Sequence, residues 1–177
     1  MAKQNTKKAA DTKKEETVVK AEPVKIIPKE IDLKQYITVR NGFHGTLVYK
    51  SSRTGELFIW DSFGAEQEME LSELRNAKNS AKGFFINNWF MFDEDSSWVI
   101  DYLGMRQYYK HFLTIDSFDD IFKQTPAQLK KTIAELSDGQ KKTVAYRASE
   151  MVTNGEIDSL KLISALEDAL GIELIEK

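Results

Sequence analysis

The chain has 177 residues, with 25 basic and 28 acidic side chains, a net charge of −3 and no cysteine. Disulfide scaffolds and cysteine chemistry are therefore excluded, and the net charge gives no general attraction to nucleic acid. The composition, 41% hydrophobic and 30% charged, is typical of a globular protein, and no apolar run approaches the roughly 18 residues of a membrane span.

The composition changes at about residue 30. The first 30 residues contain eight lysines, five acidic residues and no aromatic residue, whereas the remaining 147 carry all 19 aromatic residues and a net charge of −6. Residues 1–30 can bury too little apolar surface to offset their ordering entropy, so we predict a flexible basic arm that becomes ordered against a partner. A solvated, solubilising tail is the alternative. Because the N-terminus lacks an apolar core, no secretory signal is expected.

Within this arm, the segment Pro23–Pro28 is apolar and bracketed by prolines. Prolines favour extended backbone in the residues that precede them. An extended apolar segment is suited to adding a strand to the sheet edge of a neighbouring molecule, or to covering an edge of its own sheet. We therefore predict partner-binding roles for Val24, Ile26 and Ile27.

Residues 31–95 are predicted to form a small antiparallel β-barrel. Apolar or alternating runs between glycine-containing turns predict five strands, at Tyr36–Arg40, Thr46–Lys50, Glu56–Trp60, Glu66–Leu71 and Phe84–Phe92. A short helix capped by Ser72 is expected between the last two strands. Gly55 suits the left-handed position that a hairpin loop requires.

The predicted strand order resembles that of SH3-like small barrels. Val39, Gly42 and Gly45, followed by Leu47–Tyr49, also resemble the Val-x-x-Gly-x-x-Gly opening of barrels of the KOW type. The resemblance covers about 55 residues and implies a fold rather than a function.

The last predicted strand is unusually rich in aromatic residues. If the segment alternates, Phe85, Trp89 and Met91 lie on one face while Phe84 and Phe90 lie on the other, so both faces need a cover. Either the barrel core and the C-terminal helices cover them, or one face binds a partner protein. On the second interpretation, Phe85, Trp89 and Met91 are partner-binding residues. A base-stacking platform would need interleaved basic residues, and residues 83–101 contain none.

Residues 96–177 are predicted to form a compact helical bundle. A first helix is expected over Trp98–Leu103. Later helix starts are indicated by capping boxes at Thr125 and Ser137 and by a cap at Asp158, and helix ends by Gly155 and Gly171. The predicted fold class is thus α+β, with an arm at 1–30, a barrel at 31–95 and a helical subdomain at 96–177.

No motif predicts catalysis. The two histidines, His44 and His111, lie in no zinc-binding spacing, and the acidic run Asp93–Asp95 does not match a calcium-binding loop. The chain has neither a phosphate-binding glycine loop nor a Gly-x-Ser-x-Gly elbow. We predict a protein that is not an enzyme, with no catalytic, cofactor-binding or metal-binding residues.

The chain as a whole, with its Ala/Lys-rich arm, a barrel containing Arg53–Gly55 and Trp60, and a helical end, resembles small virion proteins of tailed bacteriophages of Gram-positive hosts. This resemblance implies a structural or assembly protein of the head, neck or tail. It would be made in the host cytoplasm, would bind other virion proteins or copies of itself as a homo-oligomer, and would not bind a membrane. The alternative is a nucleic-acid-binding regulatory protein. The acidic Glu167 and Asp168 of the last helix argue against it, because an acidic recognition helix would repel phosphate.

Overall fold

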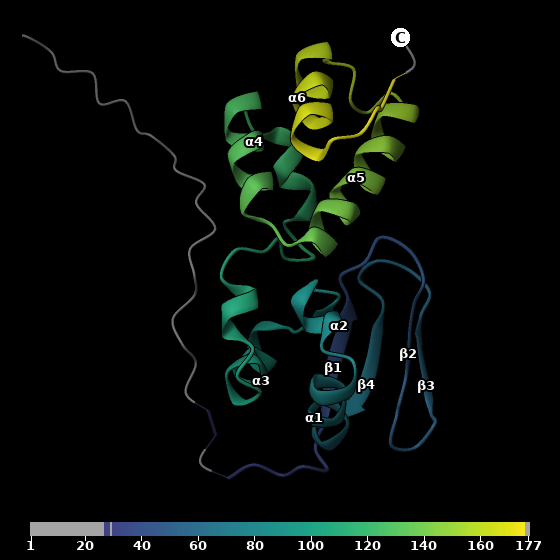
Figure 1. Cartoon of the computed structure of the whole chain (residues 1–177), viewed down its shortest axis with the longest axis vertical. Coiled ribbons are helices and arrows are strands. Elements are labelled where there is room, and N and C mark those ends of the chain that lie inside the picture. Colours follow the sequence, from purple (N-terminus) through teal and green to yellow (C-terminus); the bar gives the residue numbers. More distant parts are fainter. Residues whose placement is uncertain (1–26, 29, 176–177) are drawn as a thin grey trace, which may run out of the picture.

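The computed structural model describes residues 27–28 and 30–175, which form an α+β fold in which two small antiparallel sheets are followed by helices (Figure 1). Nearly all of the predicted arm, including Val24 and Ile26, lies outside the described residues. The strands are β1 (Tyr36–Asn41), β2 (Leu47–Lys50), β3 (Leu57–Trp60), β4 (Glu66–Glu70) and β5 (Phe90–Met91). The α-helices are α1 (Leu71–Ser80), α2 (Gly83–Ile86), α3 (Trp98–Tyr102), α4 (Pro126–Glu135), α5 (Asp138–Thr153) and α6 (Leu160–Leu170). The 3₁₀ helices are η1 (Glu94–Ser96), η2 (Arg106–Tyr109) and η3 (Phe118–Lys123).

β1 lies between β4 and β5 in a three-stranded sheet, and β2 and β3 form a two-stranded ladder. All pairs are antiparallel, with Val39 opposite Gln67 and Val48 opposite Ile59. The first four predicted strands are confirmed, because alternate side chains along each strand point into the core. Gly55 closes the β2–β3 hairpin with a φ of 78°, the left-handed conformation expected of it.

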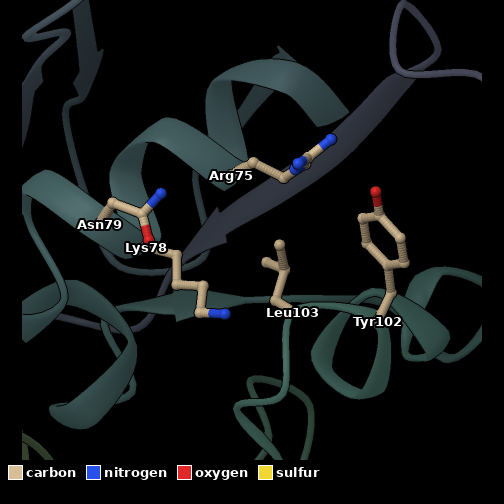
Figure 2. Close-up of a pocket in the computed structure, with 5 residues that line it drawn as sticks. All are labelled: Arg75, Lys78, Asn79, Tyr102 and Leu103. Carbon is tan, nitrogen blue, oxygen red and sulfur yellow. The ribbon is translucent and has the colours of Figure 1, made fainter.

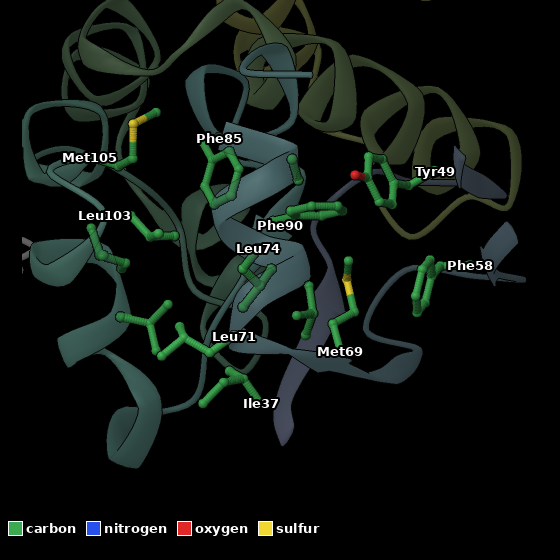
Figure 3. Packing of buried hydrophobic residues seen from close by; sticks show 14 of the residues in the cluster. Ile37, Tyr49, Phe58, Met69, Leu71, Leu74, Phe85, Phe90, Leu103 and Met105 are labelled. Carbon is green, nitrogen blue, oxygen red and sulfur yellow. The ribbon is translucent and has the colours of Figure 1, made fainter. Parts of the chain in front are cut away.

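The two ladders share one core, which α1 and α3 help to enclose (Figure 3). Trp60 of β3 is fully buried, and its indole N–H donates to the Val39 carbonyl oxygen at 2.8 Å. The Gln67 side-chain amide of β4 donates to the Ile59 carbonyl oxygen at 2.7 Å. These two bonds connect β3 to the three-stranded sheet and hold the hairpin over the core.

The predicted strand over Phe84–Phe92 is wrong, because its first three residues lie in the helix α2 and strand structure resumes only at β5. Asn88 makes the turn between them. Its φ is 54°, and its side-chain amide donates to the Tyr108 carbonyl oxygen at 2.8 Å. The helical turn removes the need for two covered strand faces, because it directs Phe85 into the core, where the side chain is fully buried.

Helices α4, α5 and α6 lie together at the other end of the molecule (Figure 1). The predicted capping box is confirmed at the start of α4. The Thr125 hydroxyl accepts a hydrogen bond from the Gln128 N–H at 3.4 Å, and the Gln128 side-chain oxygen accepts one from the Thr125 N–H at 3.2 Å. The predicted stops are confirmed at Gly155 and Gly171, with φ of 73° and 67°.

Replacing Thr125 by alanine is expected to lower the free energy of unfolding by about 1 kcal/mol, because the first turn of α4 loses its side-chain acceptor. Urea unfolding followed by circular dichroism measures the change. Gln128→Ala is the control: it removes one bond of the box but keeps the N-cap hydroxyl, so its effect should be smaller. An equal or larger loss for Gln128→Ala would contradict this account of the cap.

The predicted capping box at the start of α5 is only half correct. The Ser137 hydroxyl accepts from the Gln140 N–H at 3.2 Å, as expected of an N-cap. The Gln140 side chain, however, reaches a different chain segment: its amide donates to the Leu113 carbonyl oxygen at 2.8 Å, and its oxygen accepts from the Leu113 N–H at 2.9 Å. Gln140 is fully buried, so it satisfies the backbone of a buried connection rather than a helix end.

Two other predicted caps are wrong. The N-cap of α1 is Glu70 rather than Ser72, and the Ser72 hydroxyl instead donates to the Glu70 carboxylate at 2.8 Å. The N-cap of α6 is Ser159 rather than Asp158. The cap of α1 therefore lies two positions before the predicted residue, and the cap of α6 lies one position after it.

The buried side chains form two hydrophobic clusters, one drawn from Ile37–Tyr109 and the other from Leu113–Leu166. The clusters meet where α5 packs against the loop that follows β1, and there the Thr143 hydroxyl donates to the Gly42 carbonyl oxygen at 3.2 Å. The domain boundaries after residues 30 and 95 stay predictions.

Candidate functional site

The outer face of the β2–β3 ladder exposes apolar side chains. Val48 is 50% exposed, Leu57 56% and Ile59 43%. Val48 pairs with Ile59 across the ladder, and Leu57 lies two residues from Ile59 on the same strand face, so the three side chains are neighbours. We call them the β2–β3 patch. The other face of both strands is buried in the core, so the patch is held on a fixed backbone.

The patch lies between an open strand edge and an acidic strand. Within the described part of the chain, β2 pairs with β3 alone, and its second edge therefore presents backbone groups to an incoming strand. Beyond β3 lies β4, whose Glu66 and Glu68 are exposed. Glu68 accepts a hydrogen bond from the Thr38 hydroxyl at 2.5 Å, and Glu66 pairs with Arg40 at 2.8 Å. These surroundings suit an extended peptide with apolar and basic side chains.

The structure separates the residues predicted to bind a partner. Ile27 is 38% exposed, whereas Phe85 and Met91 are 0% and 3% exposed and belong to the core of this chain. Trp89 is half-buried, with its ring centroid 5.9 Å from that of Phe43. The aromatic segment therefore offers little surface to a partner in this conformation. Its aromatic residues are explained by packing.

The sequence held a signal for the β2–β3 patch. The run Glu56–Trp60 is apolar at four consecutive positions, and a strand in a small sheet with one buried face needs only two of them in the core. Such a run is typical of a central strand that is covered on both faces. The structure instead leaves its outer face uncovered by the described residues, and this uncovered face is the feature that sequence reasoning missed.

Beneath the hairpin lies a buried polar network centred on Glu73 of α1, which is 3% exposed. The Tyr49 hydroxyl donates to one carboxylate oxygen at 2.7 Å, the Asn76 amide donates to the same oxygen at 2.9 Å, and Arg53 donates to the other at 3.1 Å. Burial by itself raises the pKa of Glu73, but these hydrogen bonds outweigh it, so the pKa is lowered overall. Burial and the bond to Glu73 raise the pKa of Tyr49 to about 12. The network fastens the hairpin loop to α1.

Both histidines face glutamates. The Nε2 atom of His44 lies 3.5 Å from the Glu150 carboxylate, and the Nδ1 atom of His111 lies 3.4 Å from that of Glu135. Among residues 27–28 and 30–175, no three metal-ligating side chains are grouped so that they could hold an ion. The absence of catalytic, cofactor-binding and metal-binding residues stays a prediction.

A scan against protein-family models and searches of curated proteins and of solved structures found no match to this chain. Of the helices that the structure describes, none is long and apolar enough to cross a membrane.

Proposed function

We propose that this protein is a non-enzymatic structural or assembly subunit that binds neighbouring protein chains through the β2–β3 patch. The observation that carries the proposal is the row formed by Val48, Leu57 and Ile59, each between 43% and 56% exposed on a rigid two-stranded ladder with an open edge. Clustered apolar side chains on such a surface are typical of an interface. A further strand along β2 would satisfy its free backbone groups.

The occupant that fits best is the segment Val24–Ile27 from a neighbouring copy of the chain. Its prolines favour an extended conformation, and alternation places Val24 and Ile26 on one face, toward the apolar patch. Lys25 lies on the other face, within a stretch whose net charge is opposite to that of the rest of the chain. The exposed Glu66 and Glu68 of β4, on the far side of β3, supply negative charge that attracts this basic stretch as a whole.

The setting that we propose is a bacteriophage virion, with the protein made in the host cytoplasm and assembled as a homo-oligomer or with other virion proteins. The resemblance of the whole chain to small virion proteins of tailed phages supports this setting. We also propose that the five strands form a small SH3-like barrel. The bonds from Trp60 to Val39 and from Gln67 to Ile59, which link the two ladders over one core, support that fold.

Ile59→Lys and Ile26→Asp are each expected to convert an assembled protein to monomers that still melt cooperatively, because the Ile59 side chain is 43% exposed and Ile26 lies outside the described residues. Sedimentation velocity measures the mass, and circular dichroism measures the melting. Combining both changes in one chain places a positive and a negative charge on the two sides of the proposed interface, so part of the assembly should return.

Leu160→Lys is the matched control, because Leu160 is also apolar and is 71% exposed, but lies on α6 away from the patch. It should leave the mass of the assembly unchanged. A monomeric wild-type chain at high concentration, or an Ile59→Lys variant that assembles like the wild type, would show that the β2–β3 patch is not a self-association surface.

A further inference from the structure

A hollow of about 300 Å³ lies between α1 and α3 (Figure 2). In Figure 1, α3 lies on the side of α1 away from β2 and β3. Arg75, Lys78 and Asn79 line it from α1, and Tyr102 and Leu103 line it from the end of α3. Figure 2 shows the Lys78 ammonium group and the Tyr102 hydroxyl extending into the space between the two helices. Leu103, which is 2% exposed, forms an apolar wall of the hollow.

The two cations of this hollow lack a counter-ion among the described residues. Arg53 and Arg106 pair with Glu73 and Asp101, whereas no described carboxylate lies within ion-pair distance of Arg75 or Lys78. Arg75 and Lys78 are three positions apart on one helix, so both side chains lie on the same helix face. Lys78 is half-buried, which raises the cost of its unpaired charge. A bound anion would relieve this cost.

We propose that this hollow is a binding site for a carboxylate presented by an acidic segment of a partner protein. The Arg75 guanidinium and the Lys78 ammonium group supply charged donors to the carboxylate oxygens. The Tyr102 hydroxyl and the Asn79 amide add neutral donors around the same space, and Leu103 contacts the aliphatic part of the incoming side chain. The site is separate from the β2–β3 patch and gives the subunit a second contact surface.

The surroundings favour a single carboxylate over the phosphate backbone of a nucleic acid. The residues after the first 30 carry a net charge of −6, and the segment that leads into α3 contains Asp93, Glu94 and Asp95. A polyanion that followed this surface would meet those charges, and two cations would not compensate for them. One acidic side chain entering the hollow meets the cations alone.

The test uses the full chain and a short fluorescein-labelled peptide of alternating glutamate and leucine, with binding followed by fluorescence anisotropy. Arg75→Gln combined with Lys78→Gln is expected to weaken binding about tenfold, because two charge-assisted contacts are lost at a partly exposed site. Lys131→Gln combined with Lys142→Gln removes the same charge from exposed positions on α4 and α5 and should leave the affinity unchanged. Ile59→Lys should also leave it unchanged, which separates this site from the proposed assembly surface.

Three results would overturn the proposal. The first is equal weakening of peptide binding by the Arg75/Lys78 double variant and by the Lys131/Lys142 double variant, which would mean that only net charge matters. The second is equal affinity for a peptide in which glutamine replaces glutamate, because no carboxylate would then be involved. The third is competition by a single-stranded oligonucleotide at a lower concentration than the acidic peptide, which would assign the hollow to nucleic acid. Matching melting temperatures of all variants confirm that the fold is intact.

Discussion

Replacing Gly139 by alanine is expected to lower the free energy of unfolding by about 3 kcal/mol. A Cβ atom at this position would lie 2.3 Å from the Cβ atom of Asn87 and 2.4 Å from its carbonyl oxygen, so a rigid turn rather than a flexible side chain must move. The loss should appear although alanine favours helix over glycine by about 1 kcal/mol. Denaturant unfolding and the melting temperature both measure it.

Gly83→Ala is the matched control. The added Cβ atom would meet only the Asn87 side-chain nitrogen, at an ordinary 3.8 Å, and this glycine also lies in the first turn of a helix. Its effect on the free energy of unfolding should stay within about 0.5 kcal/mol. If Gly139→Ala unfolds like the wild type, α5 does not pack closely against the turn after α2, and the junction between the two hydrophobic clusters is looser than described.

Local patterns in the sequence predicted most of the elements. Apolar or alternating runs identified the first four strands, the Thr125–Gln128 box located the start of α4, and Gly155 and Gly171 marked two helix ends. These signals succeed because they are physical properties of a few neighbouring residues: side-chain direction, an acceptor for free N–H groups, and a left-handed backbone. They do not depend on what the rest of the chain does.

The errors arose where distant contacts decided the structure. Phe84–Phe92 has the apolar character of a strand, but α2 forms because Phe85 fits the core there and Asn88 is held by the carbonyl group of Tyr108, 20 positions away. Gln140 has the position of a capping-box partner, yet it bonds to Leu113, 27 positions away. No window of local sequence contains these partners, so tertiary contacts override the local preference.

The candidate sites were predictable to different degrees. The spacing of Arg75 and Lys78 places both cations on one face of α1. Tyr102, which completes the hollow, lies on α3, and nothing in the sequence indicates that α3 packs beside α1. The β2–β3 patch was detectable as an excess of apolar positions in Glu56–Trp60. Which of its two faces remains exposed depends on the pairing of β2 with β3 and on the core below them.

Replacing Glu73 by alanine is also expected to lower the free energy of unfolding by about 3 kcal/mol. The change leaves the hydroxyl of Tyr49, a side chain that is 1% exposed, without its carboxylate acceptor, and it removes the anchor of Arg53 in the hairpin loop. Tyr49→Phe removes one hydrogen bond but no charge, and about 1 kcal/mol is expected for it. The double variant should lose less than the sum of the two, because both changes break the same bond.

Stability should also depend on pH through Glu73. Because the fold lowers the pKa of this carboxyl, the unfolded chain binds more protons than the folded chain near the ordinary glutamate value of 4.5. The stabilisation is thus fully present above that value and is lost as the pH falls through the lower pKa of the folded state. Glu73→Gln removes the titrating group but retains an oxygen acceptor, so it should unfold with a weaker dependence on acid pH than the wild type.

The same network predicts a loss of stability in alkali. The pKa of Tyr49 is raised to about 12 by its burial and its bond to Glu73, so its contribution is intact below the ordinary tyrosine value of 10 and is lost as the pH rises toward 12. Tyr49→Phe should flatten the alkaline side of the profile, and Glu73→Gln the acidic side. If Tyr49→Phe leaves the alkaline side of the stability profile unchanged and Glu73→Gln leaves the acidic side unchanged, the Tyr49–Glu73 bond does not form in solution. The hairpin that carries the β2–β3 patch is then fastened to α1 by other contacts.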